Sequence, residues 1–366
     1  MDLPRCRGDF ATVPSYNGYL SRASHKRPAL GNDRTDDMKK IHNLPHRVYE
    51  STCYVNGLED LLAGKAADYS DYLLPVIGGM AGFAYLRFKR ADPPRMVYWG
   101  ASPKYLMKDL ANIIGFEEAV IEGRSFDSTF SRLKGFIEEG RPVVAGALDM
   151  YYLHYYPDLY GKLHVPIHYV LVVGYDDEEQ VIFVHDCSHK NVQEVPIDEF
   201  RKSLDVKVPG MSKKNTIRAF TLPQKIPSEF EVAKKGFSYK AERFLNPPVK
   251  LFGIPAMRKL AEEIFEWQNK KRFEHMVTYA TTPPLLPTTY ENSHGMRFWQ
   301  ANVLNELGNK YNVRNWTEAA TLFRRSGEKI MKLCEAALKQ DKQQTADFLM
   351  EIAELEERAY GLLRDL

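Results

Sequence analysis

The pattern of apolar residues changes character near residue 222 of this chain. Residues 40–222 alternate between runs with helical spacing and short apolar runs typical of strands. Beyond the next few prolines, apolar residues recur three or four positions apart, which predicts helices over 256–271, 298–312, 316–338 and 341–363. A length of 366 residues exceeds what one hydrophobic core usually supports. The sequence therefore predicts an α+β domain with an antiparallel sheet, followed by a C-terminal helical domain.

Two segments fall outside these domains. Residues 1–37 are rich in Arg, Asp, Ser, Gly and Pro and have no apolar period, so we interpret them as a leader or flexible extension. Residues 223–250 contain Pro223, Pro227, Pro247 and Pro248 and are interpreted as a linker. The first domain is then expected to span 38–222, and the helical domain 251–366.

Local signals predict the elements of the first domain. A helix is expected from Cys53 to Gly64, helices should begin at Ser102–Pro103 and at Ser125, a glycine turn should lead into a strand at 83–88, and further strands are expected at 142–148, 167–176, 181–186 and 216–222. The acidic run Asp176–Glu179 separates two of these strands and predicts a hairpin.

Composition excludes several classes of function. With 50 Lys and Arg against 48 Asp and Glu, the formal net charge is +2, so no nucleic-acid partner is expected. No apolar stretch approaches the ~18 residues needed to span a membrane, and no secretion signal is visible. The four cysteines, Cys6, Cys53, Cys187 and Cys334, lie far apart without metal-type spacing. These features predict a cytoplasmic protein with reduced thiols.

Three residues form a candidate catalytic triad. Cys53 follows two hydroxyl residues that are able to cap a helix, and the positive end of the helix dipole favours a thiolate. His168 opens the first strand of the predicted hairpin, and Asp186 ends the second. A cysteine on a helix, followed in chain order by His and Asp on neighbouring strands, is the arrangement used by papain-like enzymes. We therefore predict Cys53 as nucleophile, His168 as base and Asp186 as the residue that orients it.

Each of these residues also has an ordinary structural interpretation. A single Cys is often a small buried hydrophobe, a strand His often a core residue, and an Asp after a strand often a turn former. Cys187 is the alternative nucleophile, while His154, His164 and His185 are alternative bases. A metal site built from His164, His168, His185 and Asp186 is a weaker alternative because the helical His-Glu-x-x-His pattern is missing. Neither a metal nor a cofactor is predicted.

Two further groups are candidates for contact with substrate. The segment 150–160 is dense in tyrosines, and Tyr151, Tyr152, Tyr155, Tyr156 and Tyr160 are candidate substrate-binding residues. The same tyrosines would also serve simply to cover a sheet edge. For the oxyanion that forms during acyl transfer, the candidate donors are the backbone N–H of Cys53 and the side chain of Asn56.

Several of these motifs together resemble the butirosin biosynthesis protein H family. They are Ser51–Gly57 around the cysteine, the glycine turn before Phe83 and Tyr85, Gly140–Val144 with Asp149, His168-Tyr169 with Val173–Asp176, His185-Asp186, and Gly295–Phe298 in the helical part. The resemblance extends over nearly all residues after 40 and implies a papain-like fold with an accompanying helical domain. One departure is Thr52, which stands where many relatives are expected to have His.

The resemblance also implies an activity. Proteins of that family move an acyl group from an acyl carrier protein to an amine of an aminoglycoside antibiotic. This chain is accordingly expected to be an acyltransferase of secondary metabolism, with a carrier-protein or coenzyme A thioester as donor and a small-molecule amine as acceptor. A cysteine peptidase or amidase with the same triad, or a non-catalytic binding protein on the same fold, remains an alternative. The sequence also leaves room for a homo-oligomer.

Overall fold

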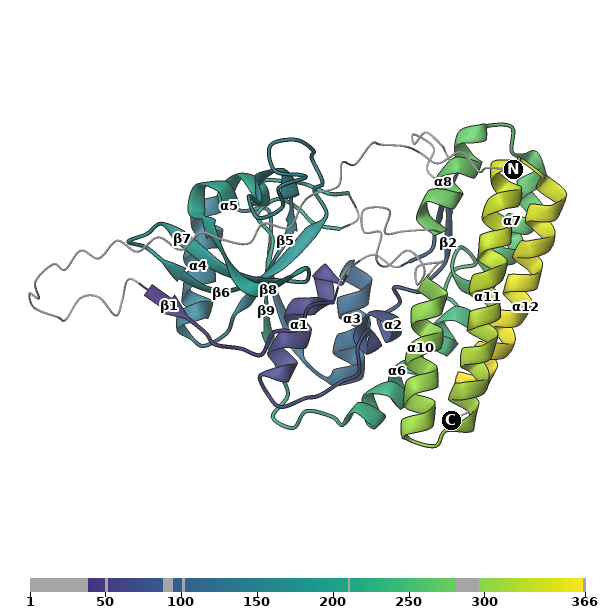
Figure 1. Cartoon of the computed structure of the whole chain (residues 1–366), viewed down its shortest axis with the longest axis horizontal. Coiled ribbons are helices and arrows are strands. Elements are labelled where there is room, and N and C mark those ends of the chain that lie inside the picture. The colour runs from purple at the N-terminus through teal and green to yellow at the C-terminus, as the bar shows by residue number, and fades with distance from the viewer. Residues whose placement is uncertain are drawn as a thin grey trace, which may run out of the picture.

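The structure is a computed structural model that describes residues 39–49, 52–87, 95–100, 103–209, 211–280 and 296–364. The predicted leader 1–37 lies outside these ranges. Figure 1 shows the large sheet toward one end of the molecule and the long helices α11 and α12 side by side at the other. No helix within the described ranges is both long enough and apolar enough to cross a lipid bilayer.

The described strands form two antiparallel sheets. The larger is seven-stranded, with the order β4-β9-β5-β6-β7-β8 and with β1 paired to β6. Its strands are β1 (Lys39–Ile41), β4 (Glu117–Ile121), β5 (Val143–Leu148), β6 (His168–Asp176), β7 (Val181–Asp186), β8 (His189–Pro196) and β9 (Ile217–Thr221). The smaller sheet pairs β2 (Ala84–Arg87) with β3 (Arg95–Tyr98). The α+β class and the predicted antiparallel hairpin of β6 and β7 are confirmed.

Helices surround the sheet and make up the C-terminal region. Those before residue 223 are α1 (Cys53–Ala63), α2 (Leu73–Ile77), α3 (Pro103–Ile114), α4 (Phe126–Glu138) and α5 (Ile197–Leu204), with a 3-10 turn at Met150–Tyr152. Those after it are α6 (Glu229–Leu245), α7 (Gly253–Glu263), α8 (Lys270–Ala280), α10 (Arg297–Lys310), α11 (Arg314–Leu338) and α12 (Lys342–Arg364), with a 3-10 turn at Ile264–Glu266. The predicted C-terminal helical region is thereby confirmed.

Two predicted helix starts differ in their capping. Ser125 caps α4 as expected, since its hydroxyl accepts a hydrogen bond from the N–H of Ser128 at 3.3 Å. Thr52 occupies the cap position of α1 but makes no side-chain cap bond. Its hydroxyl instead donates to the carbonyl of Tyr49 at 2.6 Å, which fastens the preceding chain. The start of α1 at Cys53 therefore depends on packing rather than on the predicted side-chain cap.

The segment interpreted as a linker contains a helix. Helix α6 occupies 229–245 and starts with a complete capping box between Ser228 and Glu231. Pro227 and Pro247 lie just outside its two ends, so these prolines delimit the helix rather than mark irregular chain. One face of α6, including Val232 and Phe237, is fully buried in the core.

One hydrophobic cluster joins the two predicted domains. It contains Leu58 of α1 and Tyr169 of β6, but also Phe237 of α6 and Tyr360 of α12. A second, smaller cluster lies on the opposite side of the sheet, beneath α4 and α5. The C-terminal helices are therefore packed directly against the layer that carries Cys53.

A buried ion pair strengthens this junction. Arg297 of α10 is fully buried, donates to both carboxylate oxygens of Glu356 at 2.7 and 2.9 Å, and also donates to the carbonyl of Gly82 at 2.9 Å. Leaving one such charge buried without its partner costs about 3–5 kcal/mol. The guanidinium therefore fixes the helical region to the glycine turn that precedes β2.

Candidate active site

The fold brings the three predicted catalytic side chains to one place. Cys53 is the first residue of α1, His168 the first of β6, and Asp186 the last of β7. Because β6 and β7 are antiparallel neighbours, the start of β6 and the end of β7 lie side by side at the same end of the hairpin. The Nε2 atom of His168 lies 2.6 Å from Oδ2 of Asp186.

The thiol of Cys53 lies on the other side of the same imidazole. It lies near enough to His168 to raise the pKa of the imidazole, and since Nε2 faces Asp186, Nδ1 is the ring nitrogen left for the sulfur. The sulfur also lies 4.0 Å from the carbonyl oxygen of Ile167. Cys53 is half-buried, whereas His168 and Asp186 are buried. The order sulfur, imidazole, carboxylate is the one expected of a cysteine triad.

The charges of this group are set by its buried pair. Burial alone would lower the pKa of His168, but the charge of Asp186 and the hydrogen bond to it raise that pKa to about 10. Burial alone would raise the pKa of Asp186, but the charge of His168 and the hydrogen bonds it accepts hold that pKa well below its usual range. At neutral pH the pair is therefore an imidazolium beside a carboxylate.

Two of the predicted substrate-binding tyrosines have a different role. The hydroxyl of Tyr155 donates to Oδ2 of Asp186 at 2.9 Å, and that of Tyr156 donates to Oδ1 at 2.6 Å. The backbone N–H of Ser188 also donates to Oδ1, at 3.1 Å. Both tyrosine hydroxyls thus serve the carboxylate, and Tyr155 and Tyr156 position Asp186 rather than offer free donors to a substrate.

The other tyrosines fasten the loop or stay available. Tyr160 donates to Glu199 of α5 at 2.5 Å, which holds the end of the loop. Tyr151 stacks on His164 with ring centroids 4.2 Å apart, and His164 pairs with Asp149 at 2.6 Å. Tyr152 stands edge-on to Tyr151. Tyr151 and Tyr152 remain candidates for contact with substrate.

Of the two predicted oxyanion donors, Asn56 already has a hydrogen-bond partner within the protein. The N–H of Cys53 lies in the first turn of α1 and makes no hydrogen bond to any described residue, as is usual for such groups. Asn56 is buried, and its amide nitrogen donates to the carbonyl of Arg47 at 2.9 Å. The structure therefore gives Asn56 a role in holding the segment before α1, and the backbone of Cys53 is the better candidate.

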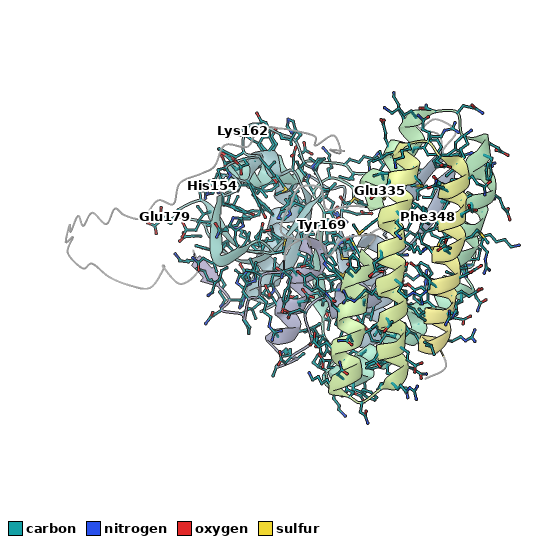
Figure 2. All side chains as sticks on the ribbon, turned by 45° about the vertical axis from the view of Figure 1, so that its right-hand side comes forward. His154, Lys162, Tyr169, Glu179, Glu335 and Phe348 are labelled. Atoms are coloured by element: carbon teal, nitrogen blue, oxygen red, sulfur yellow. The ribbon has the colours of Figure 1, made fainter. Side chains whose placement is uncertain are left out.

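Tyr169 is a residue near the site that the sequence did not single out. Its neighbour His168 points the other way from the strand, so the Tyr169 ring faces α1 and lies edge-on to Tyr54 at 5.9 Å. Figure 2 shows Tyr169 between the sheet and the long C-terminal helices. Its hydroxyl is buried, and burial raises its pKa, with smaller effects from nearby Arg218, Cys53 and Ser212. Strand alternation alone predicts the face, but not these neighbours.

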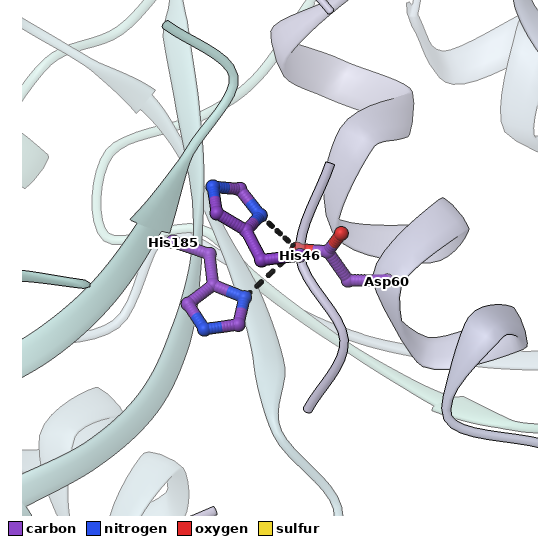
Figure 3. Close-up of side chains that lie close together, drawn as sticks. All are labelled: His46, Asp60 and His185. Carbon is purple, nitrogen blue, oxygen red and sulfur yellow. Dashed lines mark hydrogen bonds and ion pairs between the residues drawn. The ribbon is translucent and has the colours of Figure 1, made fainter. Parts of the chain in front are cut away.

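The histidines weighed as a metal site do not converge. His164 pairs with Asp149, His168 with Asp186, and His185 with Asp60 of α1. A different cluster forms instead from His46, Asp60 and His185, whose ligating atoms all lie within 4.8 Å of one another (Figure 3). Its members are far apart in sequence, and no local pattern connects them.

The thiols are expected to differ in reactivity, with iodoacetamide modifying Cys53 fastest near neutral pH. Among the three cysteines that the structure describes, Cys53 alone combines a helix N-terminus with a neighbouring imidazolium. Burial raises the pKa of Cys187 well above its usual value, with further contributions from Cys53 and Asp186, and burial raises the pKa of Cys334 to about 12. Peptide mapping after brief labelling measures the rates, and Cys53→Ala is the control. Equal labelling of Cys187 and Cys53 in the folded protein would contradict the triad. Cys6 lies outside the described residues.

Comparison with known proteins gives one match. Residues 52–187 match the family model described as butirosin biosynthesis protein H, N-terminal. That range contains Cys53, His168 and Asp186, and it confirms the resemblance expected from the sequence over these residues. The C-terminal helices lie outside the matched range. No curated protein matches the chain.

Proposed function

We propose that this chain, whose residues 52–187 match the family model of the butirosin biosynthesis protein H N-terminal region, is a biosynthetic enzyme of an antibiotic pathway that transfers an acyl group through Cys53. The donor is a thioester of an acyl carrier protein or of coenzyme A, and the acceptor is an amine of a small molecule. The helix bearing Cys53 packs on an antiparallel sheet whose edge carries His168 and Asp186, and this supports assignment to the papain-like fold.

One observation carries the proposal. A buried His168 lies 2.6 Å from Asp186 through Nε2, and Cys53 is near enough to raise the pKa of the same imidazole. An imidazolium in that position stabilises a thiolate, which is the form of cysteine that attacks thioesters. A binding protein without catalysis has no need of such a pair. Isolated burial of two ionised groups is costly unless they are paired and hydrogen-bonded, as these are.

The chemistry follows from these positions. The Cys53 sulfur attacks the thioester carbonyl carbon, and the carbonyl oxygen becomes an oxyanion that accepts from the N–H of Cys53. When the tetrahedral intermediate collapses, the carbon–sulfur bond to the donor breaks, and His168 protonates the departing thiolate. The neutral imidazole then takes a proton from the attacking amine. Expulsion of the Cys53 thiolate yields the amide and restores the imidazolium.

Water must be kept from the acyl-enzyme if the amine is to capture it. The loop carrying Tyr151 and Tyr152 lies beside the triad because its next residues, Tyr155 and Tyr156, bond to Asp186. The proposal assigns this loop to cover the acyl group.

The test is to incubate the protein with an acyl-thioester and follow its intact mass. A transferase is expected to gain the mass of the acyl group on Cys53 and to keep it while no acceptor is present. Addition of a primary amine should then discharge the adduct to an amide. Cys53→Ser is the matched control, because it keeps the size of the side chain while removing the thiolate.

The contrary outcome is equally specific. A peptidase or amidase with the same triad would release free acid with water alone, and no added amine would divert the acyl group. That result would replace acyl transfer by hydrolysis while leaving the triad in place. Absence of any adduct or turnover, together with an unreactive thiol, would favour a non-catalytic binding protein.

A further inference from the structure

A buried carboxylate joins two histidines behind the candidate triad. Oδ2 of Asp60 lies 2.7 Å from Nδ1 of His46 and 2.8 Å from Nδ1 of His185, as Figure 3 shows. The Asp60 side chain is 1% exposed, and the two rings face each other with centroids 4.2 Å apart. We call these three residues the clasp.

The clasp is held by hydrogen bonds between the two imidazole rings and the carboxylate of Asp60. His46 also donates from Nε2 to the carbonyl of His189 at 2.9 Å, so both of its nitrogens face acceptors. Burial would lower the pKa of His46, but the hydrogen bond and the charge of Asp60 raise it. The other oxygen of Asp60 accepts from the N–H of Arg47 at 3.3 Å. An imidazolium at His46 therefore satisfies the site.

A metal ion is the other chemistry that two histidines and a carboxylate suggest. The nitrogen–oxygen separations of 2.7 and 2.8 Å are ordinary lengths for a charge-assisted hydrogen bond. A bound cation would also have to replace the proton that His46 needs in order to face the carboxylate. The geometry thus favours protons over a metal.

The clasp connects the elements that carry the triad. Asp60 lies about two turns beyond Cys53 on α1, and His185 immediately precedes Asp186 on β7. His46 holds the carbonyl of His189, the first residue of β8, which pairs with Asp186 across the turn. Residues on both sides of Asp186 are therefore tied to the helix of the nucleophile.

His189 also packs against the two tyrosines that donate to Asp186. The His189 ring lies edge-on to Tyr155 at 5.0 Å and to Tyr156 at 4.8 Å, the two tyrosines that donate to Asp186. Nδ1 of His189 itself lies 3.8 Å from Oδ1 of Asp186. Displacement of His189 would thus loosen the carboxylate from several directions.

We propose that the clasp is a positioning device, which holds Asp186 against His168 and thereby keeps the imidazole protonated beside Cys53. Its use in acyl transfer rests on the proposed function, but its effect on the thiol does not. The groups that face His168 are Asp186 from β7, Cys53 from α1 and the Tyr156 hydroxyl from the loop.

Glu59, beside Asp60 on α1, is another carboxyl near the clasp. Burial, with smaller contributions from Asp60 and Asp71, raises its pKa to about 8. Cys187 lies near Cys53 and Asp186 and stays protonated because burial raises its pKa. Release of the clasp is therefore expected to act on the thiol chiefly through the contact between Asp186 and His168.

The test measures alkylation of Cys53 by iodoacetate, an anion that reacts fastest when an imidazolium stands beside the thiolate. Below the raised pKa of His168 the imidazolium is present, and it is lost as the pH rises through that pKa. In Asp60→Asn, we expect the alkaline limb of the rate to move down by about one pH unit, while the rate at neutral pH changes little because His168 stays protonated there. His42→Gln is the matched control, since His42 lies in the same segment and its ring bonds to the carbonyl of Ile137, away from the clasp.

A second pair of variants keeps the test valid if Asp60→Asn unfolds. His185→Asn retains a donor near the position of Nδ1 and should behave like the wild type, whereas His185→Ala should show the shifted profile. A lower unfolding temperature with an unchanged pH profile in both Asp60→Asn and His185→Ala would overturn the proposal in favour of a purely structural cluster. Stoichiometric divalent metal in the purified protein, with a chelator lowering its unfolding temperature, would overturn it in favour of a metal centre. None of these measurements needs an acyl substrate, so failure of the acyl-transfer assay leaves them interpretable.

Discussion

Replacement of His168 by Ala is expected to abolish formation of an acyl-enzyme on Cys53. The imidazolium is the group that stabilises the thiolate and protonates the departing thiol, and both steps are lost with it. Loss of a triad histidine reduces turnover by roughly six orders of magnitude in a well-studied hydrolase. Quench-flow mass spectrometry of the intact protein measures the acylation rate.

The fold must be controlled for separately in this variant. Ala at position 168 leaves the buried carboxylate of Asp186 with Tyr155, Tyr156 and Ser188 but without its countercharge. His168→Gln is the better variant, because its amide is able to donate to Asp186 yet cannot act as base. Turnover that persists in both variants would move the base elsewhere. His164 and His185 are already paired with Asp149 and Asp60, which leaves His154, beside Glu199 at 3.5 Å.

Asp186→Asn is expected to reduce the acylation rate by roughly three to four orders of magnitude, as in other triads. Oδ1 accepts from the N–H of Ser188, and Oδ2 accepts from His168. An amide has a single oxygen, so its NH₂ group must face one of these two donors. The charge that raises the pKa of His168 is lost as well, so at neutral pH less imidazolium stands beside Cys53.

The pH dependence separates this effect from general damage. In the wild type the imidazolium persists up to about pH 10, whereas in Asp186→Asn it should disappear at a lower pH. Asp177→Asn serves as control, because it removes a carboxylate paired with Lys134 at the far end of the same hairpin. Wild-type rates in Asp186→Asn across the whole pH range would show that the carboxylate does not orient His168.

Local patterns in the sequence predicted much of the fold. The helix from Cys53 and its end before Gly64, the capping of α4 by Ser125 and the hairpin around Asp176 each depend on neighbouring residues, and each is found as expected. The predicted helix 256–271 is interrupted, because Trp267 is extended and buried under Phe273. A large side chain that turns inward at the end of a helix leaves no periodic signal.

Elements without an apolar pattern escaped prediction. Strand β8, at the sheet edge, has mainly exposed or half-exposed residues, and β4 is similarly exposed. Neither strand therefore shows a clear alternation of apolar and polar residues. The order of the triad along the chain was sufficient to predict Cys53, His168 and Asp186 as neighbours. The hydroxyls of Tyr155 and Tyr156 on Asp186, and the clasp, depend on contacts between distant segments, which a single sequence does not reveal.

The position of β9 has a consequence for how this protein is made. Residues 217–221 lie between β4 and β5, so the last strand in sequence fills an interior place in the sheet. During synthesis on the ribosome, β4 and β5 cannot complete their pairing until β9 has emerged. The matched family segment ends before β9, at residue 187. Shortened versions ending there would carry the whole triad but would lack β8 and β9, which leaves open edges on β4, β5 and β7, and open strand edges are sites for aggregation. A fragment library for this protein should therefore extend beyond Thr221, even where only the chemistry of Cys53 is wanted.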